Sequence, residues 1–206
     1  MKTLFIEAKY KGPISLSKEI IEKLPSKIGL VSSIQFLDNL SSLKKAIPKA
    51  LIGGQILGCD ASAAAKIESK VDAFLYIGDG AFHPLAVALA TKKPVYQYNP
   101  LIKSFSEIKK EDIEAYNKRK KGALLKFLNA ENVGILISTK SGQSYPVNKL
   151  KSLEKKYKDK KFYKFIADTV DYKQLENFPF IEAWVNTACP RIEEDIRIVN
   201  ITEFEG

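Results

Sequence analysis

Short apolar runs alternate with stretches of helical spacing along the chain, and few folds are compatible with this order. Strands separated by helices are joined by crossover connections, so the pattern predicts an α/β fold with mostly parallel sheets. The expected strands are Thr3–Glu7, Ile28–Ser32, Leu51–Ile56, Ala73–Ile77, Val95–Tyr98, Val133–Ser138, Phe162–Ile166, Ala183–Val185 and Ile196–Val199. The expected helices are Ser17–Leu24, Leu40–Ile47, Ser62–Lys70, Pro84–Ala90, Glu107–Leu128 and one near Pro146–Tyr157.

The strands and helices form two successive series that look like diverged copies of one plan. Each series begins with a strand, and each places a cysteine after a later strand. We therefore expect two homologous, Rossmann-like, three-layer domains, in residues 1–129 and 130–206, with the boundary after the long helix. No Gly/Ser-rich linker separates them, so rigid packing of the domains is the expectation.

The net charge of +9 comes almost entirely from lysine, since only Arg119, Arg191 and Arg197 are arginine. Proteins that read nucleic acids rely on arginine, so a solvated lysine surface is the favoured interpretation and no specific nucleic acid is expected. Attraction to an anionic partner and a basic RNA-associated domain are the alternatives. No apolar run approaches the roughly 20 residues of a membrane helix. The N-terminus does not resemble a signal peptide, and two cysteines are too few for a disulfide scaffold, so a cytoplasmic protein is expected.

The two cysteines, Cys59 and Cys189, each follow an apolar run that ends in small residues. Ligands bind beyond the carboxyl ends of parallel strands, so thiols in matching topological positions suggest one site shared by two similar domains. Asp60 or Ser62 is a candidate cap for the helix after Cys59, which would favour the thiolate through the helix dipole. Pro190 stiffens the turn after Cys189, and Arg191 is suited to a substrate carboxylate or an anionic metal site. The alternative for both cysteines is a small thiol packed in a turn.

The residue set limits which metal these thiols can hold. Zinc is a poor fit because the chain has one histidine and no Cys-x-x-Cys pair. Iron–sulfur clusters need three or four thiolates as a rule, and two fall short of that. Either another chain supplies more ligands, or the site is something else.

A second candidate centre is the run Gly78-Asp79-Gly80, which follows a buried strand and precedes a helix. Glycines allow close approach of the backbone to a ligand, and Asp79 can accept a hydrogen bond from a ligand amine or hydroxyl. His83 lies just before the expected helix, where a packed or capping role is the alternative. Residues 96–100 end the next strand and are expected to line the same cleft or simply pack there. An ordinary turn also explains Gly-Asp-Gly, and no dinucleotide, phosphate-loop or serine-nucleophile motif is present.

Four segments together carry a resemblance to a known family: Gly54–Cys59, Asp72–Leu85, Lys93–Pro100 and Asn177–Arg191. They resemble, in order and over essentially the whole chain, the archaeal 2-(3-amino-3-carboxypropyl)histidine synthase family of diphthamide biosynthesis. The last segment is the longest and the most specific.

The resemblance implies a fold and a metal centre. Members of the family have three homologous α/β domains, each of which supplies one cysteine to a 4Fe-4S cluster, and S-adenosylmethionine occupies the open iron position. By resemblance, Cys59 and Cys189 are the cluster ligands of the middle and last domains. The first domain is absent from this sequence, so a separate chain that carries it and the third cysteine is the expected partner.

The resemblance also implies a reaction. The reduced cluster cleaves S-adenosylmethionine into methylthioadenosine and a 3-amino-3-carboxypropyl radical, which adds to a histidine of elongation factor 2. Gln55, Gly78, Asp79, Gly80, His83 and Arg191 are the candidate S-adenosylmethionine or neighbouring contacts, and no residue is assigned a catalytic role. The family forms dimers, so a homo-oligomer is possible. The alternative is a non-catalytic accessory subunit that binds the elongation factor or a catalytic partner.

Overall fold

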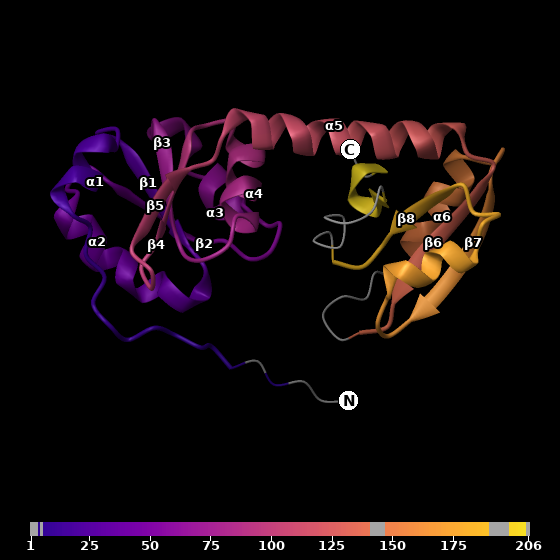
Figure 1. The fold of residues 1–206 in the computed structure, drawn as a ribbon, viewed down its shortest axis with the longest axis horizontal. Helices are drawn as coiled ribbons and strands as arrows, with labels where there is room; N and C mark the ends of the chain where they lie inside the picture. The colour runs from indigo at the N-terminus through magenta and orange to yellow at the C-terminus, as the bar shows by residue number, and fades with distance from the viewer. Residues whose placement is uncertain (1–3, 5, 141–146, 190–197, 205–206) are drawn as a thin grey trace. The chain divides into compact units, whose positions relative to one another are not determined.

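The structure is a computed structural model that describes residue 4 and residues 6–140, 147–189 and 198–204. Within the helix that begins at Val147, side chains are described from Leu150 onward. The chain divides into two compact units, a first unit of Met1–Ile113 and a second unit of Glu114–Gly206. Each unit has its own sheet (Figure 1). Each also has its own hydrophobic core.

The first unit contains a five-stranded sheet in the order β2-β1-β3-β4-β5. The strands are β1 (Ile28–Ser32), β2 (Leu51–Gln55), β3 (Ala73–Ile77), β4 (Val95–Asn99) and β5 (Ser104–Glu107). All neighbours are parallel except β5, which pairs antiparallel with β4. Both β1 and β3 are buried at every position, as expected for central strands of a parallel sheet covered on two faces.

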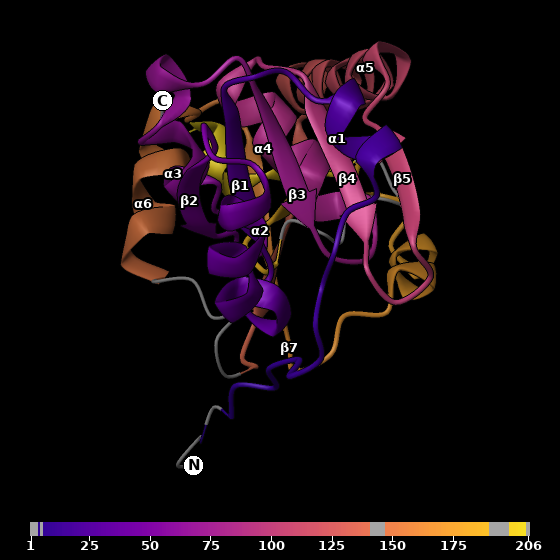
Figure 2. The same ribbon diagram turned by 90° about the vertical axis from the view of Figure 1, so that its left-hand side faces the viewer.

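Helical segments cover both faces of this sheet, so the first unit has three layers (Figure 2). On one face lie α1 (Lys18–Lys23), η1 (Ile34–Asn39) and α2 (Leu40–Ala46), packed on Leu30, Leu75 and their neighbours. On the other lie α3 (Ser62–Ala65), η2 (Glu68–Lys70) and α4 (Phe82–Thr91). Side chains that alternate along β1 and β3 therefore enter two separate cores.

The second unit contains a parallel sheet in the order β7-β6-β8-β9. The strands are β6 (Asn132–Ser138), β7 (Lys161–Ala167), β8 (Ala183–Asn186) and β9 (Val199–Asn200). One face is covered by α6 (Val147–Lys156), η5 (Ile201–Phe204) and the C-terminal part of α5 (Lys110–Asn129). The other face carries η3 (Tyr172–Asn177) and a cluster of aromatic rings that includes Phe165, Phe178 and Trp184.

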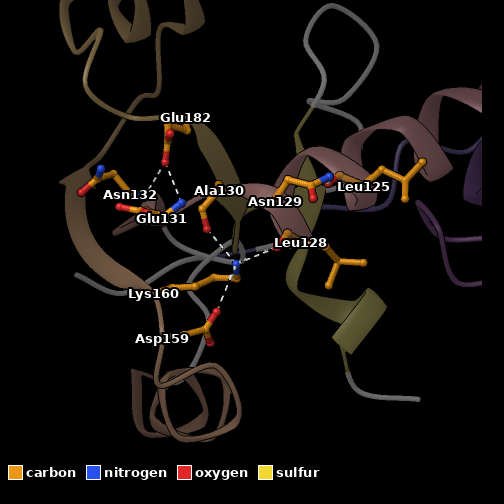
Figure 3. Close-up of polar contacts among 9 residues, drawn as sticks. All are labelled: Leu125, Leu128, Asn129, Ala130, Glu131, Asn132, Asp159, Lys160 and Glu182. Atoms are coloured by element: carbon orange, nitrogen blue, oxygen red, sulfur yellow. Dashed lines mark hydrogen bonds and ion pairs between the residues drawn. The ribbon is translucent and has the colours of Figure 1, made fainter.

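Two polar side chains hold the junction between α5 and β6 (Figure 3). The ammonium of Lys160, which is 9% exposed, donates to the backbone oxygens of Leu128 at 2.9 Å and Ala130 at 2.7 Å. These carbonyls lie at the end of α5, where a helix leaves its last acceptors unpaired. The carboxylate of Glu182 accepts from the backbone N–H groups of Glu131 at 2.6 Å and Asn132 at 2.8 Å. The start of β6 is thereby fixed to the segment that leads into β8.

The α/β class and the parallel sheets agree with the sequence prediction, but three elements differ. The expected strand Thr3–Glu7 is wrong, because Leu4 and Ile6 are non-strand and more than 80% exposed (82% and 83%). Strand β5 was not predicted from its polar sequence. The expected helix Ser62–Lys70 is two short pieces, α3 and η2.

The division between the units also differs from the boundary expected at residue 129. It falls inside α5, because Ala123 and Phe127 of this helix belong to the core of the second unit. No helix among residue 4 and residues 6–140, 147–189 and 198–204 is both long and apolar enough to cross a membrane.

Candidate functional site

Both sheets have the same topological switch point. In the first unit the chain leaves β1 toward β2 on one side and leaves the adjacent β3 toward β4 on the other; β6 and β8 are related in the same way. Ligands bind in open α/β sheets at the carboxyl ends of such a strand pair. The loops at these places are residues 78–80 after β3 and residues 187–189 after β8.

The loop after β3 is held in one conformation by side chains from the end of β4. The Asp79 carboxylate accepts through Oδ1 from the backbone N–H of Gly80 and from Asn99 Nδ2, both at 2.8 Å. Gln97 Nε2 donates to the backbone oxygens of Gly78 at 3.3 Å and Gly80 at 3.1 Å. Gly80 has φ +72°, a conformation that glycine adopts without strain. Asp79 itself is exposed.

Beneath this loop, Tyr76 and His83 form a stacked pair, with ring centroids 5.7 Å apart and planes at 12°. Tyr76 is fully buried, and burial raises the pKa of its hydroxyl to about 12, with the nearby Asp79 charge acting in the same direction. A Cβ added at Gly78 would lie 2.5 Å from the Tyr76 hydroxyl oxygen, so only glycine fits above this ring. His83 therefore stacks on Tyr76, the ring on which Gly78 of the loop rests.

Cys59 lies in a tight turn after β2. The turn runs from Leu57 to Asp60, whose backbone groups bond to each other in both directions, at 3.2 and 3.0 Å. Gly58 takes φ +61° at the first central position, and Cys59 occupies the second and is exposed. This geometry is that of a hairpin turn, which requires a positive φ at the position of Gly58.

The helix-dipole argument for Cys59 is not supported. The following helix, α3, has only four residues, and the Asp60 carboxylate accepts from the Ser62 N–H at its start, at 2.9 Å. That bond, with the Ser62 hydroxyl, lowers the pKa of Asp60. The N-cap residue of α3 is Ala61, with no side-chain capping bond, so neither Asp60 nor Ser62 is the expected cap. A helix this short also offers little dipole to the thiol.

Cys189 lies at the switch point of the second sheet, in a loop fixed by a buried asparagine. Asn186, 1% exposed, accepts through Oδ1 from the Ala188 N–H at 2.9 Å. Its Nδ2 donates to the Cys189 carbonyl at 3.2 Å and to Asn200 Oδ1, at the end of β9, at 2.8 Å. The Thr187 hydroxyl donates to the backbone oxygen of Leu136 in β6 at 2.7 Å. The loop is thus bonded to both neighbouring strands, and Cys189 is partly exposed.

Other predicted site residues are less well defined. Gln55 is the last residue of β2, four positions before Cys59, and lies opposite Ser32 of β1. Pro190 and Arg191 lie outside the described residues. The expectation that the two cysteines hold matching topological positions is wrong, because Cys59 follows the second strand of its unit and Cys189 the third.

Each unit by itself offers one thiol and no complete metal site. Within residue 4 and residues 6–140, 147–189 and 198–204, no group of three or more His, Cys, Asp or Glu side chains is arranged to hold a metal ion. Both thiols lie in loops at the carboxyl edge of a sheet and reach the surface. Each is therefore suited to contribute one ligand to a centre that other groups complete.

The sequence reasoning did not single out Asn186 and Asn200. Both are at least 95% buried, with 1% and 4% exposure. An asparagine at the end of an otherwise apolar strand is a signal for such a role, since a buried amide must find hydrogen-bond partners. Gln97 and Asn99 were expected to line the same cleft as the Gly78–Gly80 loop or to pack there, and both bond to that loop.

The fold defines an α/β protein of two units, each with a mostly parallel sheet. The loops described above lie at the carboxyl edge of each sheet, where such proteins bind ligands. A protein-family model described as "Putative diphthamide synthesis protein" matches residues 1–205. The chain therefore belongs to the diphthamide synthesis family.

Individual relatives give the same assignment. The chain is 32% identical over 191 residues to 2-(3-amino-3-carboxypropyl)histidine synthase of Pyrococcus horikoshii, covering 85% of this chain and 53% of that protein. It is 30% identical over 210 residues to the protein of that name from Methanocaldococcus jannaschii, covering 95% and 57%. The crystal structure of Dph2 from Pyrococcus horikoshii with a 4Fe-4S cluster matches with a TM-score of 0.76 and 29% identity, over 91% of this chain and 58% of that one. The chain thus spans little more than half the length of these relatives.

Proposed function

We propose that this chain is a component of a 2-(3-amino-3-carboxypropyl)histidine synthase that acts in the first step of diphthamide synthesis. It would transfer the 3-amino-3-carboxypropyl group of S-adenosylmethionine to a histidine of elongation factor 2 in the cytoplasm. One observation carries the proposal: both thiols lie in surface loops at the carboxyl edges of parallel sheets, in a chain that resembles a protein crystallised with a 4Fe-4S cluster.

Cys59 and Cys189 are the proposed cluster ligands. Thiolates are the usual iron ligands in such clusters, and neither loop buries its sulfur in the core of its own unit. When bound, the cluster would supply the electron that cleaves S-adenosylmethionine. The contribution of this chain would be to hold two thiolates in fixed loops, and Asn186 supports that for Cys189 through its bonds to Ala188 and to the Cys189 backbone.

A partner chain with a third thiolate is part of the proposal. Clusters of this kind require three or four thiolates, and this chain has two cysteines. The chain covers 53% and 57% of the two synthases, and the proposed partner would supply residues that correspond to part of the remainder. Elongation factor 2 would be the protein substrate.

The proposed S-adenosylmethionine contacts are Gln55, the Gly78–Gly80 loop, His83 and Arg191. The loop supports this role because it stands at the switch point of the first sheet with its backbone held by Gln97. Small residues there let a ligand approach the backbone closely.

Anaerobic reconstitution with iron and sulfide tests the ligand assignment. The chain is loaded with and without a partner that carries the missing domain, and bound iron and the cluster absorption are measured for wild type, Cys59→Ala and Cys189→Ala. We expect each cysteine variant to lose most of its iron, while Ser62→Ala, next to the first loop, keeps it. Wild-type iron content in both cysteine variants would contradict the assignment.

The same preparation separates a catalytic component from an accessory subunit. Reduced wild-type complex supplied with S-adenosylmethionine should release methylthioadenosine, and either cysteine variant should not. If the variants release as much as wild type, the thiols have no part in the reaction and the accessory role is the better account.

A further inference from the structure

The paired central strands of the two units can be aligned residue by residue. In the first unit, Ala73 of β3 lies opposite Ile28 of β1, and the pairing passes Tyr76 opposite Val31 and ends at Ile77 opposite Ser32. In the second unit, Ala183 of β8 lies opposite Val133 of β6, and the pairing continues to Asn186 opposite Leu136. The two strand pairs have the same direction and the same place in sheets of the same strand order.

A packing feature fixes the register of this alignment. Gly29 of β1 lies opposite Phe74, and a Cβ added to that glycine would lie 2.6 Å from the ring. Gly134 of β6 lies opposite Trp184, and an added Cβ there would meet that ring closer still. An aromatic ring covering a strand glycine is a specific device for pinning strand register. Its presence at the same step in both units makes Phe74 and Trp184 equivalent.

The alignment places Asp79 where the second unit has Cys189. Each residue lies five positions after the aromatic ring, in the loop at the switch point. The aligned segments are Asp72-Ala73-Phe74-Leu75-Tyr76-Ile77-Gly78-Asp79 and Glu182-Ala183-Trp184-Val185-Asn186-Thr187-Ala188-Cys189. The two residues therefore occupy the same functional position on two sheets, one as a carboxylate and one as a thiol.

The Asp79 carboxylate is held in place, and no described lysine or arginine forms an ion pair with it. Asn99 and the Gly80 N–H fix Oδ1, and Oδ2 has no bond with the described residues. The chain has 33 lysines and arginines, yet none of those in the described ranges lies within the 4.0 Å of an ion pair with Asp79. A fixed anion that pairs with no cation of the described residues is suited to a positively charged ligand.

We propose that Asp79 is the specificity residue that binds the cationic part of the S-adenosyl ligand, through its ammonium or its sulfonium group. This rests on the proposed function for the identity of the ligand. The geometry that carries it is the fixed carboxylate at the switch point, in the position of Cys189. Asn99 is then a positioning residue, because it orients the carboxylate and does not need to touch the ligand.

Binding of three ligands of decreasing charge to the full chain tests this. S-adenosylmethionine carries both cations, S-adenosylhomocysteine only the ammonium, and methylthioadenosine neither. Equilibrium dialysis is done with wild type, Asp79→Asn and Asp72→Asn, the last being a neutralised carboxylate just before the same strand. We expect Asp79→Asn to weaken S-adenosylmethionine about tenfold or more, the worth of one hydrogen bond to a charged group, while methylthioadenosine and the Asp72→Asn variant are unaffected.

The affinity for S-adenosylhomocysteine shows which cation Asp79 binds. If Asp79→Asn loses affinity equally for S-adenosylmethionine and S-adenosylhomocysteine, the carboxylate binds the ammonium. If it loses affinity for S-adenosylmethionine alone, the carboxylate binds the sulfonium. Three outcomes would each overturn the inference. Asp79→Asn could bind methylthioadenosine as much more weakly as it binds S-adenosylmethionine, it could bind S-adenosylmethionine as well as wild type does, or wild type could fail to bind S-adenosylmethionine. Iron loading of the cysteine variants is independent of this measurement, so failure here leaves the cluster assignment standing.

Discussion

The first and second units share a sheet and differ at its carboxyl edge. Both have the strand order second-first-third-fourth, and both cover a glycine of the first strand with an aromatic ring of the third. The first unit places its cysteine in an exposed hairpin turn after the strand at the sheet edge. The second places its cysteine at the switch point, in a loop bonded to strands on either side.

This difference teaches that the sheet register is kept while the chemistry of the loops changes. The position that carries a thiol in the second unit carries the Asp79 carboxylate in the first, and Cys59 arises from another strand. Function resides in sites built on a fold rather than in the fold itself. Changes to the shared register should therefore damage either unit, whereas changes to unit-specific contacts should damage only one.

The largest effect is expected from filling the shared glycine positions. Gly29→Ala and Gly134→Ala each force a methyl group into the ring of Phe74 or Trp184, in strands pinned on both sides. We expect each to lower the free energy of unfolding by about 3 kcal/mol, the upper end for overpacking a core. Denaturant unfolding followed by hydrogen exchange should locate the loss in the first unit for Gly29→Ala and in the second for Gly134→Ala.

Gly122→Ala is the matched control, because a Cβ there meets nothing within 4 Å in the middle of α5. It should stabilise the protein by up to about 1 kcal/mol, since alanine favours a helix more than glycine does. If the strand variants are as stable as wild type, the rings do not pin the register and the alignment of the units loses its marker.

A smaller effect is expected at Lys160, a buried cation of the second unit that has no buried counterpart among the described residues of the first. Lys160 precedes β7 as Ala50 precedes β2, and each N–H bonds three residues back, to Tyr157 and Ile47. Lys160→Met keeps the stem but leaves the Leu128 and Ala130 carbonyls without their donor. We expect a loss of about 2 kcal/mol, the cost of unsatisfied buried acceptors.

Lys158→Met, at an exposed lysine two residues earlier, should leave the free energy of unfolding within about 0.5 kcal/mol of wild type. Hydrogen exchange should show the Lys160→Met effect at the end of α5 and the start of β6. An equal loss in the first unit would show that the two units do not unfold separately.

Much of the fold can be predicted from the sequence because strands buried on both faces consist of apolar residues. Strands β1 and β3 have the predicted bounds, and every one of their residues is buried. In the expected strand Thr3–Glu7, which looks equally apolar, the described residues Leu4 and Ile6 lie outside any strand and are exposed. Strand β5 is the converse: it is polar, and it forms because β4 offers an open edge.

The sequence predicts where the loops of the candidate site lie, but not the hydrogen bonds that hold those loops. Cys59 and the Gly78–Gly80 loop stand at strand ends, which apolar runs reveal. The bonds of Asn186 to Asn200, and of Asn99 to Asp79, join residues 14 and 20 positions apart. Such pairs depend on which strands are neighbours, and the sequence does not state that order. The third strand of each unit could be aligned only once its pairing was known.

The smallest effect is expected from lowering the pH, which should weaken the contribution of Glu182 to the stability of the second unit. Accepting from the Asn132 and Glu131 N–H groups lowers the pKa of Glu182 below its ordinary 4.5. Its counterpart Asp72 makes no side-chain hydrogen bond with the described residues. A lowered pKa in the folded state adds stability above pH 4.5, and that stability is lost as the pH falls through the folded-state pKa. Acid should therefore remove the stability that the ionised Glu182 adds to the second unit. Glu182→Gln should flatten this pH dependence while Asp72→Asn leaves it unchanged, measured by denaturant unfolding with hydrogen exchange across the acid range. The same acid sensitivity in wild type and Glu182→Gln would show that ionisation of Glu182 does not stabilise the second unit, because the carboxylate would then hold β6 no better than an uncharged amide.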